Sequence, residues 1–244
     1  EQNNLKYILD IGSGVGVLGI ALAKRYSASL TACDRDALAL AVTAHNATAN
    51  NITCTIRGGL DTTDLAGAED QNKYQLVVAN LPAKAGMPVL FRILAAAAKA
   101  TDHRGRIAIV VVTNLADTIR HQFSKIADII NEVHGNRHIV LHGRPRHPVV
   151  SDDTGLSCYQ RNDGHVTLTG FTYPLTTVYG LPDFDTPSHV SRIATGLIKR
   201  SYILPKSNRE KISILCWNPG QGHLLAWLAR MYLESKYPTP YFTI

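Results

Sequence analysis

The stretch Ile8-Leu-Asp-Ile-Gly-Ser-Gly-Val-Gly-Val-Leu-Gly19 decides the fold of this chain. An apolar run, Tyr7–Ile11, leads directly into glycines at every second position, and a helical pattern follows over Val17–Lys24. Glycine tolerates a positive φ and lets the backbone approach a ligand closely, and the first turn of a helix presents unbonded N–H groups. The stretch therefore predicts a strand, a tight turn and a helix that together bind an anionic or carboxylate-bearing ligand.

Short apolar runs alternate with helical patterns along the first half of the chain, which is typical of βαβ units around a parallel sheet. Further strands are expected at 29–34, 53–57, 75–79 and 107–112, and further helices at 36–50, 89–100 and 116–133. Near-continuous apolar runs such as IAIVVV indicate parallel strands that are buried on both faces. The pattern predicts an α/β fold with a doubly wound, Rossmann-like, mostly parallel sheet. The stretch RHIVLHGRPRHPVV, 137–150, is expected to form an antiparallel hairpin that closes this sheet.

An internal repeat defines the domain organisation. ILDIGSGVGVLGIALAKRY (8–26) and ILCWNPGQGHLLAWLARMY (214–232) align without a gap, but Cys216 and Asn218 replace Asp10 and Gly12. We expect a ligand-binding domain over 1–150, a linker over 151–176 with the turn signals SDDTG and RNDG, and the start of a degenerate second copy over 177–244. A helix at 187–199 and a strand at 212–217 are expected there. Because so short a stretch cannot build a complete second domain, the chain is expected to be a truncated piece of a longer tandem protein.

Composition narrows the functional classes. The chain has 244 residues, 45% of them apolar and 18% charged, and no window approaches the ~18 uninterrupted apolar residues of a bilayer span. The expectation is a soluble, cytoplasmic protein with no membrane partner. The formal net charge of +6 favours an anionic partner modestly. The four cysteines are too widely spaced for a metal ribbon and are expected to be buried thiols, and the ten histidines show no paired-ligand spacing, so no metal site is expected.

The glycine turn fits two cofactors. Gly14-x-Gly16-x-x-Gly19 satisfies the dinucleotide fingerprint, so the pattern alone does not separate NAD from S-adenosylmethionine. Asp10 favours the second, because an acidic residue ahead of the first glycine can take the ammonium of a methionine moiety, directly or through water. Asp34, which closes the second strand, suits a carboxylate that accepts hydrogen bonds from ribose hydroxyls.

Other candidate cofactor residues flank these. Ser13 lies within the turn and Arg35 directly follows Asp34. Gly58-Gly59-Leu60-Asp61 follows the third strand, where such a fold meets an adenine ring. Asp61, like Asp64, also fits a loop or helix-cap role, so this assignment stays open.

The motif that indicates the chemistry is Asn80-Leu-Pro-Ala-Lys-Ala-Gly86, directly after the apolar strand QLVVA. The side-chain amide of Asn80 and the carbonyl of Leu81, fixed by Pro82, provide two acceptors that converge on one point. Such a pair can hold an amino group with its lone pair aimed at a sulfonium methyl for direct displacement. This chemistry requires no metal.

The order of DxGxGxG, an acidic end of the second strand and N-x-P-x-basic-x-G resembles the class I methyltransferases. Within them it resembles the small-domain methyltransferase family, which includes the ribosomal RNA guanine-N2-methyltransferases, and the similarity runs from about residue 6 to 150. The resemblance implies that S-adenosylmethionine is the cofactor, S-adenosylhomocysteine the product and ribosomal RNA the partner. It also implies roles at matching positions: Asp10, Gly12, Gly14 and Gly16 for the methionine end, Asp34 for the ribose, and Asn80, Leu81 and Pro82 for the target amine.

The sequence departs from the family pattern at two positions. Leu81 stands where a second proline is usual, and Ala83 stands where a bulky residue packs beside the target base. Alternatives therefore stay open: a methyltransferase acting on a protein or a small molecule, a non-catalytic scaffold that binds cofactor and RNA, or a nicotinamide-dependent oxidoreductase. Arg137, Arg144 and Arg146 form a modest basic group that either contacts phosphates or is simply solvated.

Overall fold

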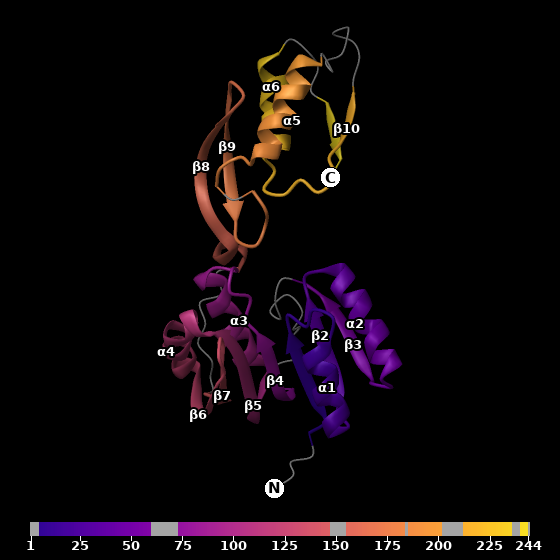
Figure 1. The fold of residues 1–244 in the computed structure, drawn as a ribbon, viewed down its shortest axis with the longest axis vertical. Helices are drawn as coiled ribbons and strands as arrows, with labels where there is room; N and C mark the ends of the chain where they lie inside the picture. The colour runs from indigo at the N-terminus through magenta and orange to yellow at the C-terminus, as the bar shows by residue number, and fades with distance from the viewer. Residues whose placement is uncertain are drawn as a thin grey trace. The chain divides into compact units, whose positions relative to one another are not determined.

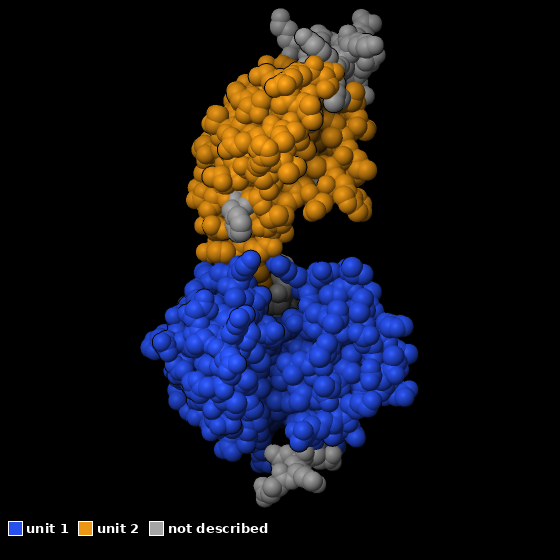
Figure 2. Space-filling model, in the orientation of Figure 1, with its two compact units in different colours: residues 1–153 blue, residues 154–244 orange. Residues whose placement is uncertain are grey.

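The chain folds into two compact units, residues 1–153 and residues 154–244, which Figure 2 distinguishes by colour. The structure is a computed structural model that describes residues 5–59, 73–146, 155–183, 185–201, 212–235 and 240–243. Among these described residues, no helix combines the length and the hydropathy needed to cross a bilayer.

The first unit is built on a seven-stranded sheet in the order β3-β2-β1-β4-β5-β7-β6. Its strands are β1 (Tyr7–Ile11), β2 (Ser29–Asp34), β3 (Cys54–Gly58), β4 (Tyr74–Asn80), β5 (Thr101–Val112), β6 (Ala127–His134) and β7 (His138–Pro145). The first five strands pair in parallel, and β7 pairs antiparallel with both β5 and β6. The predicted α/β class, with a mostly parallel sheet and antiparallel closing strands, is confirmed.

Four helices cover this sheet: α1 (Val17–Tyr26), α2 (Ala37–Ala49), α3 (Met87–Ala100) and α4 (Ala116–Ile126), the last preceded by the short 3₁₀ helix η2 (Thr113–Leu115). In Figure 1, α1 and α2 lie beside β1 to β3, and α3 and α4 lie beside β4 to β7. The strand order reverses between β1 and β4. Because crossovers between parallel strands are right-handed, the two pairs of helices lie on opposite faces, and the carboxyl ends of β1 and β4 are where sheets of this kind bind ligands.

The strands and helices follow the apolar pattern closely in the core. The β1 strand and the β2 strand occupy the predicted residues, and alternate side chains of β5 and β7 are almost completely buried under α3 and α4. Fully buried side chains there include Ile107, Ile109, Leu141 and Phe123. At about 25 cal/mol per Å² of apolar surface, such side chains contribute roughly 1.5–3 kcal/mol each.

The prediction of one helix over 116–133 was wrong in its second half. The helix α4 ends at Ile126, and the next residues form β6, which pairs with β7. The apolar residues Ile126, Ile129 and Val133 continue the helical spacing, and no glycine or proline marks the boundary. Pairing with β7 decides the conformation, because tertiary contacts override a weak local preference.

The second unit begins with the 3₁₀ helix η3 (Gly155–Tyr159) and a hairpin of β8 (Gln160–Leu168) and β9 (Phe171–Val178), followed by α5 (His189–Arg200). The expectation of a linker over 151–176 was therefore wrong for residues 160–176. The turn signal RNDG lies inside β8, next to a shift in register between Gln160 and Asn162. After α5 come β10 (Ser213–Leu215), α6 (His223–Glu234) and β11 (Tyr241–Thr243), and β10 and β11 pair in parallel.

A small apolar core holds the second unit together. The fully buried Trp227 packs edge-on against Phe171, with ring centroids 5.7 Å apart, and Tyr173 lies in the same cluster. This core joins the hairpin to α6.

Only Cys33 of the four cysteines is buried, so the expectation of buried thiols was wrong for the other three, and none of the four forms a disulfide.

The packing of α4 on β7 predicts the effect of one methyl group. In a Gly143→Ala variant, the new Cβ would lie 2.8 Å from the ring of Phe123 and 3.0 Å from the Ala127 Cβ. We expect overpacking to lower the free energy of unfolding by roughly 1–3 kcal/mol. Chemical denaturation of the variant and the wild type measures the change in the free energy of unfolding. As a control, Gly58→Ala meets its nearest atom at 3.5 Å and should change the value by less than about 0.5 kcal/mol; equal stability of the two variants would contradict this packing.

Candidate functional site

A buried carboxylate joins the end of β1 to the start of α1. Asp10 is 2% exposed, and its Oδ2 accepts a hydrogen bond of 2.8 Å from the backbone N–H of Gly19. The N-cap residue, directly before α1, is Gly16, which has no side chain to cap the helix. Asp10 therefore satisfies an N–H of the first helical turn from the neighbouring strand, where the helix dipole favours a negative charge. This structural role comes in addition to the predicted ligand role.

Gly19 is what allows this contact. A Cβ at Gly19 would lie 2.7 Å from Asp10 Oδ2 and 2.8 Å from Leu30 Cδ1, so no larger residue fits unless the helix or these side chains shift. The third glycine of a dinucleotide-type pattern permits close packing of helix on strand. Here the close packing of α1 on β1 brings the backbone N–H of Gly19 within hydrogen-bond distance of the Asp10 carboxylate.

Burial changes the chemistry of Asp10. Loss of hydration raises its pKa to about 6, the Gly19 N–H opposes this rise, and the negative charge of Asp34 adds to it. A carboxylate in such a place gains from a cation that lies beside it, because the cation offsets the lost hydration. The site therefore fits a ligand with an ammonium group.

The glycine turn has a backbone that only glycine adopts readily. The φ angles of Gly12, Gly14 and Gly16 are 70°, 55° and 86°. The N–H groups of Gly12 and Ser13 both donate to the carbonyl of Cys33, at 2.8 and 2.9 Å, which holds the turn against the end of β2. The hydroxyl of Ser13 is buried and has no hydrogen-bond partner among the described residues. An unsatisfied buried hydroxyl is costly, and a polar ligand in the turn would satisfy it.

Asp34, at the end of β2, is already engaged with the backbone. Its Oδ2 accepts a hydrogen bond of 2.8 Å from the Gly14 N–H, and its Oδ1 accepts one of 2.9 Å from the Asp36 N–H. Each carboxylate oxygen can accept a second bond, so a ribose role stays possible. Asp36 caps α2 by accepting a hydrogen bond of 2.8 Å from the Leu38 N–H, and the neighbouring Arg35 is exposed.

Two residues of α2 that the sequence analysis missed hold the turn from its other side. The hydroxyl of Thr43 donates to the Gly14 carbonyl at 2.7 Å, and the amide of Asn46 donates to the Val15 carbonyl at 2.9 Å. Thr43 is fully buried. Nothing in a single sequence indicates this contact, because it joins positions about thirty residues apart.

Asn80 ends β4 beside the glycine turn that follows β1. The ladder between β1 and β4 aligns Ile11 with Ala79, so the two strands end side by side. A Cβ at Gly12 would lie 4.0 Å from the Asn80 carbonyl oxygen, which makes the two turns direct neighbours. The Asn80 side chain is exposed, and within the described part of the chain its amide makes no hydrogen bond.

Backbone hydrogen bonds hold the loop that follows Asn80 in place. The Leu81 N–H donates to the Val110 carbonyl at 2.9 Å, and the Leu81 side chain is buried. The Pro82 carbonyl accepts from the Ala85 N–H at 2.9 Å, which closes a turn before α3. The loop is thus anchored at both ends, while Pro82 and Ala83 are exposed to solvent.

The profile of the Methyltransferase small domain family matches residues 1–140 of this chain. The chain belongs to the methyltransferase small domain family. Ribosomal protein L11 methyltransferases of Helicobacter acinonychis and Helicobacter pylori J99 are 35% and 37% identical to it over 80 residues, which are 32% of this chain and 23% of each relative.

Two solved structures share the fold. The 16S rRNA N2 G1207 methyltransferase of Thermus thermophilus, solved in complex with AdoMet and guanosine, aligns with a TM-score of 0.64 at 18% identity over 93% of this chain and 56% of its own. The ribosomal protein L11 methylase of Lactobacillus delbrueckii subsp. bulgaricus aligns with a TM-score of 0.50 at 21% identity over 58% of this chain and 70% of its own. The matched segment thus spans under a quarter of the curated relatives, and this chain covers about half of the 16S rRNA enzyme.

The remaining predicted residues of the methyltransferase small domain are the acidic residues after β3 and the basic group around β7. Asp61 and Asp64 lie outside the described residues. The basic group divides along β7: Arg137 is at the hairpin tip beside the carboxyl end of β5, whereas Arg144 is at the opposite end and Arg146 pairs with Asp128. No cluster of three or more metal-ligating side chains occurs within the described ranges.

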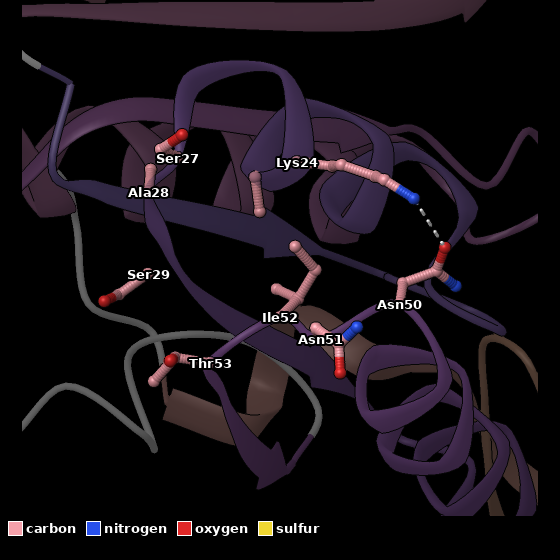
Figure 3. A pocket seen from close by; sticks show the side chains of 9 residues that line it. Lys24, Ser27, Ala28, Ser29, Asn50, Asn51, Ile52 and Thr53 are labelled. Atoms are coloured by element: carbon pink, nitrogen blue, oxygen red, sulfur yellow. Dashed lines mark hydrogen bonds between the residues drawn. The ribbon is translucent and has the colours of Figure 1, made fainter.

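The methyltransferase small domain also has a recess at the opposite edge of the sheet, shown in Figure 3. It has a volume of about 340 Å³ and is lined by residues at the ends of α1 and α2 and the starts of β2 and β3, including Lys24, Ser29 and Asn50. Lys24 Nζ lies 3.4 Å from Asn50 Oδ1 across it. Since ligands of such sheets bind at the carboxyl ends of the strands, we do not assign the cofactor to this recess.

The second unit contains a turn with the same backbone as the glycine turn. Asn218, Gly220 and Gly222 have φ angles of 52°, 57° and 85°. The Gly222 N–H donates to the Pro219 carbonyl at 2.9 Å, as the Gly16 N–H donates to the Ser13 carbonyl at 2.8 Å.

The side chains around the second turn differ from those of the first. Cys216 and Leu225 stand where Asp10 and Gly19 would be, so both partners of the buried contact are replaced. Gln221, in the place of the exposed Val15, is buried and hydrogen-bonds the backbone N–H and carbonyl of Val178 at 2.9 and 2.8 Å. The second turn therefore binds its own hairpin.

The raised pKa of Asp10 predicts a pH-dependent stability difference between the wild type and Asp10→Asn. The pKa of Asp10 is about 6 in the folded protein against an ordinary value of 3.8, so wild-type stability falls as pH rises through this range. The asparagine still offers an oxygen to Gly19 but carries no charge. We expect the variant to gain on the order of 1–3 kcal/mol relative to the wild type between pH 4 and 7. Urea unfolding at several pH values measures the difference, and a constant difference would refute the assignment.

Proposed function

We propose that this chain is an S-adenosylmethionine-dependent methyltransferase that acts on an exocyclic amine, guanine N2, of ribosomal RNA. The observation that carries the proposal is the close approach of the glycine turn after Asp10 to Asn80, at the ends of adjacent parallel strands. One strand end offers a negative charge for an ammonium, and the other offers acceptors for an amine. Family membership and the fold support this reading.

The residues of the turn fit the cofactor. S-adenosylmethionine supplies a methyl group on a positively charged sulfur. Asp10 would hold its ammonium, Ser13 and the turn from Gly12 to Gly16 would hold its methionine end, and Asp34 would accept from its ribose. The buried hydroxyl of Ser13 and the desolvated carboxylate of Asp10 both lack the partner that such a ligand would provide. Arg35 and Asp61 remain proposed contacts to the nucleoside.

Asn80, Leu81 and Pro82 would position the amine. The Asn80 amide oxygen and the Leu81 carbonyl accept its two hydrogens, which leaves the lone pair pointing away from the protein acceptors and toward the methyl donor. Anchoring of Leu81 to β5 and of Pro82 to Ala85 keeps these acceptors fixed. Proximity and orientation are the contributions of this chain, and no ionisable base is needed at the reacting atom.

A second candidate substrate is a ribosomal protein amine. The matches to ribosomal protein L11 methyltransferases favour it, and the small Ala83 leaves room for a substrate other than a base. We favour RNA because the 16S rRNA N2 G1207 methyltransferase aligns with 93% of this chain, whereas the L11 matches cover 32%.

We also propose that residues 177–244 begin a second, degenerate copy of the domain. The shared φ angles and hydrogen bonds of the two turns support the duplication, and so does a shared strand contact. The Ser29 N–H donates to the Lys6 carbonyl, and the Tyr241 N–H donates to the Ile212 carbonyl; Ser29 and Tyr241 each begin the second strand of a parallel pair, opposite Tyr7 and Ser213. The loss of the carboxylate and the buried Gln221 support a turn without cofactor.

Asn80→Ala tests the proposed chemistry. Loss of one positioning acceptor should lower kcat by about 10²–10³-fold, while the affinity for S-adenosylhomocysteine stays within about three-fold of wild type, a change worth less than 1 kcal/mol. The assay is transfer of a labelled methyl group to undermethylated ribosomes, with RNA and protein separated afterwards and the RNA nucleosides identified by mass spectrometry.

The control and the contrary results are specific. Asn131→Ala, at an exposed asparagine of β6 away from this loop, should retain activity. Turnover by Asn80→Ala at the wild-type rate would remove the assigned role, and label in protein alone would replace RNA with the second candidate substrate.

A further inference from the structure

The tip of the β6–β7 hairpin lies at the same edge of the sheet as Asn80. Val112, the last residue of β5, pairs with His138, and the Thr113 N–H donates to the Arg137 carbonyl at 2.9 Å. A second bond, from the Gly135 N–H to the His138 carbonyl at 2.8 Å, closes the tip. The backbone of Arg137 is therefore fixed beside the carboxyl end of β5.

The sheet register gives the separation of this tip from Asn80. Asn80 pairs with Val110, and Val110 pairs with Val140, three residues beyond Arg137. Two strand spacings across and three residues along the strand place the Arg137 Cα about 14 Å from the Asn80 Cα. A nucleotide held at Asn80 would have its neighbouring phosphates within reach of the long Arg137 side chain.

The basic side chains at this edge differ in whether a carboxylate contacts them. Arg120 pairs with Asp117 and Glu132 at 2.6 Å, and His134 contacts Glu132 at 2.9 Å. Lys84, in the loop after Asn80, and Arg137 are exposed and form no ion pair within the described ranges. We call these two residues the cationic rim.

An unneutralised rim beside the amine-positioning loop fits a polyanion. We propose that Lys84 and Arg137 bind phosphates of single-stranded RNA on either side of the nucleotide whose amine is held at Asn80. This inference rests on the proposed function and assigns its RNA to a defined surface. Phosphate contacts of this kind fix the register of the strand and carry no base information.

Arg144 provides a matched control. It lies on the same strand ladder as Arg137 and is also exposed, but it is seven residues away, about 23 Å along the strand, at the opposite edge of the sheet. It is near enough to Arg106 to repel its charge, so that edge is also cationic. A merely non-specific attraction of RNA to positive charge would involve Arg144 as much as Arg137.

The experiment measures the binding of a fluorescein-labelled, mixed-sequence single-stranded RNA by anisotropy at several salt concentrations. Lys84→Ala and Arg137→Ala should each weaken binding roughly five-fold, a loss of about 1 kcal/mol. The double variant should flatten the slope of log K against log salt by about 1.4, because single-stranded RNA contributes about 0.7 per phosphate contact. Arg144→Ala should bind as the wild type does, and Arg137→Lys should retain most of the slope.

The outcomes separate this inference from the proposed function. Transfer to RNA by the rim variants should show a raised KM for RNA, an unchanged kcat and unchanged affinity for S-adenosylhomocysteine. An unchanged slope in the double variant, an equal loss in Arg144→Ala, or no RNA binding by the wild type would overturn the rim. Normal RNA transfer with an unchanged slope would leave the proposed function standing, whereas rim-dependent RNA binding without any methyl transfer would refute the function and retain the surface.

Discussion

The hydrogen bond from the Gly19 N–H to the buried Asp10 carboxylate is the interaction on which the rest of the site depends. It joins β1 to α1 at the point where the strand order reverses, between β1 and β4. Removal of a carboxylate from water is costly. The Gly19 N–H and the positive end of the helix dipole stabilise the Asp10 carboxylate and offset part of that cost. The Gly19 N–H offsets only part of this cost, because the pKa of Asp10 stays raised at about 6. A positively charged ligand group beside Asp10 would offset more of it, and this links the architecture to the choice of ligand.

The second turn shows what the backbone does without that carboxylate. Its φ angles match those of the first turn, yet Cys216 and Leu225 replace the acid and the glycine, and Gln221 fastens the turn to Val178. The strand–turn–helix geometry is therefore independent of ligand chemistry. Within one chain, the comparison assigns the geometry to the glycines and the proposed binding function to Asp10 and Gly19.

Much of the first unit could be predicted from sequence because its strands are apolar runs bounded by glycine and acidic residues. The α4–β6 boundary could not, since apolar spacing over 119–133 suits a helix throughout and only pairing with β7 makes a strand. The hairpin of the second unit was missed because RNDG reads as a turn but lies within a strand. The contacts of Thr43 and Asn46, and the backbone bonds of Asp34, join distant positions and leave no local signal.

Calorimetric titration of the whole chain with S-adenosylhomocysteine and, separately, with NAD tests the central claim most directly. The account predicts that one S-adenosylhomocysteine binds per chain and that NAD gives no heat of binding. The affinity for S-adenosylhomocysteine should increase as pH rises through about 6, because Asp10 must be ionised to attract the ammonium. Binding of NAD alone, or S-adenosylhomocysteine affinity that does not change between pH 5 and 7, would contradict it.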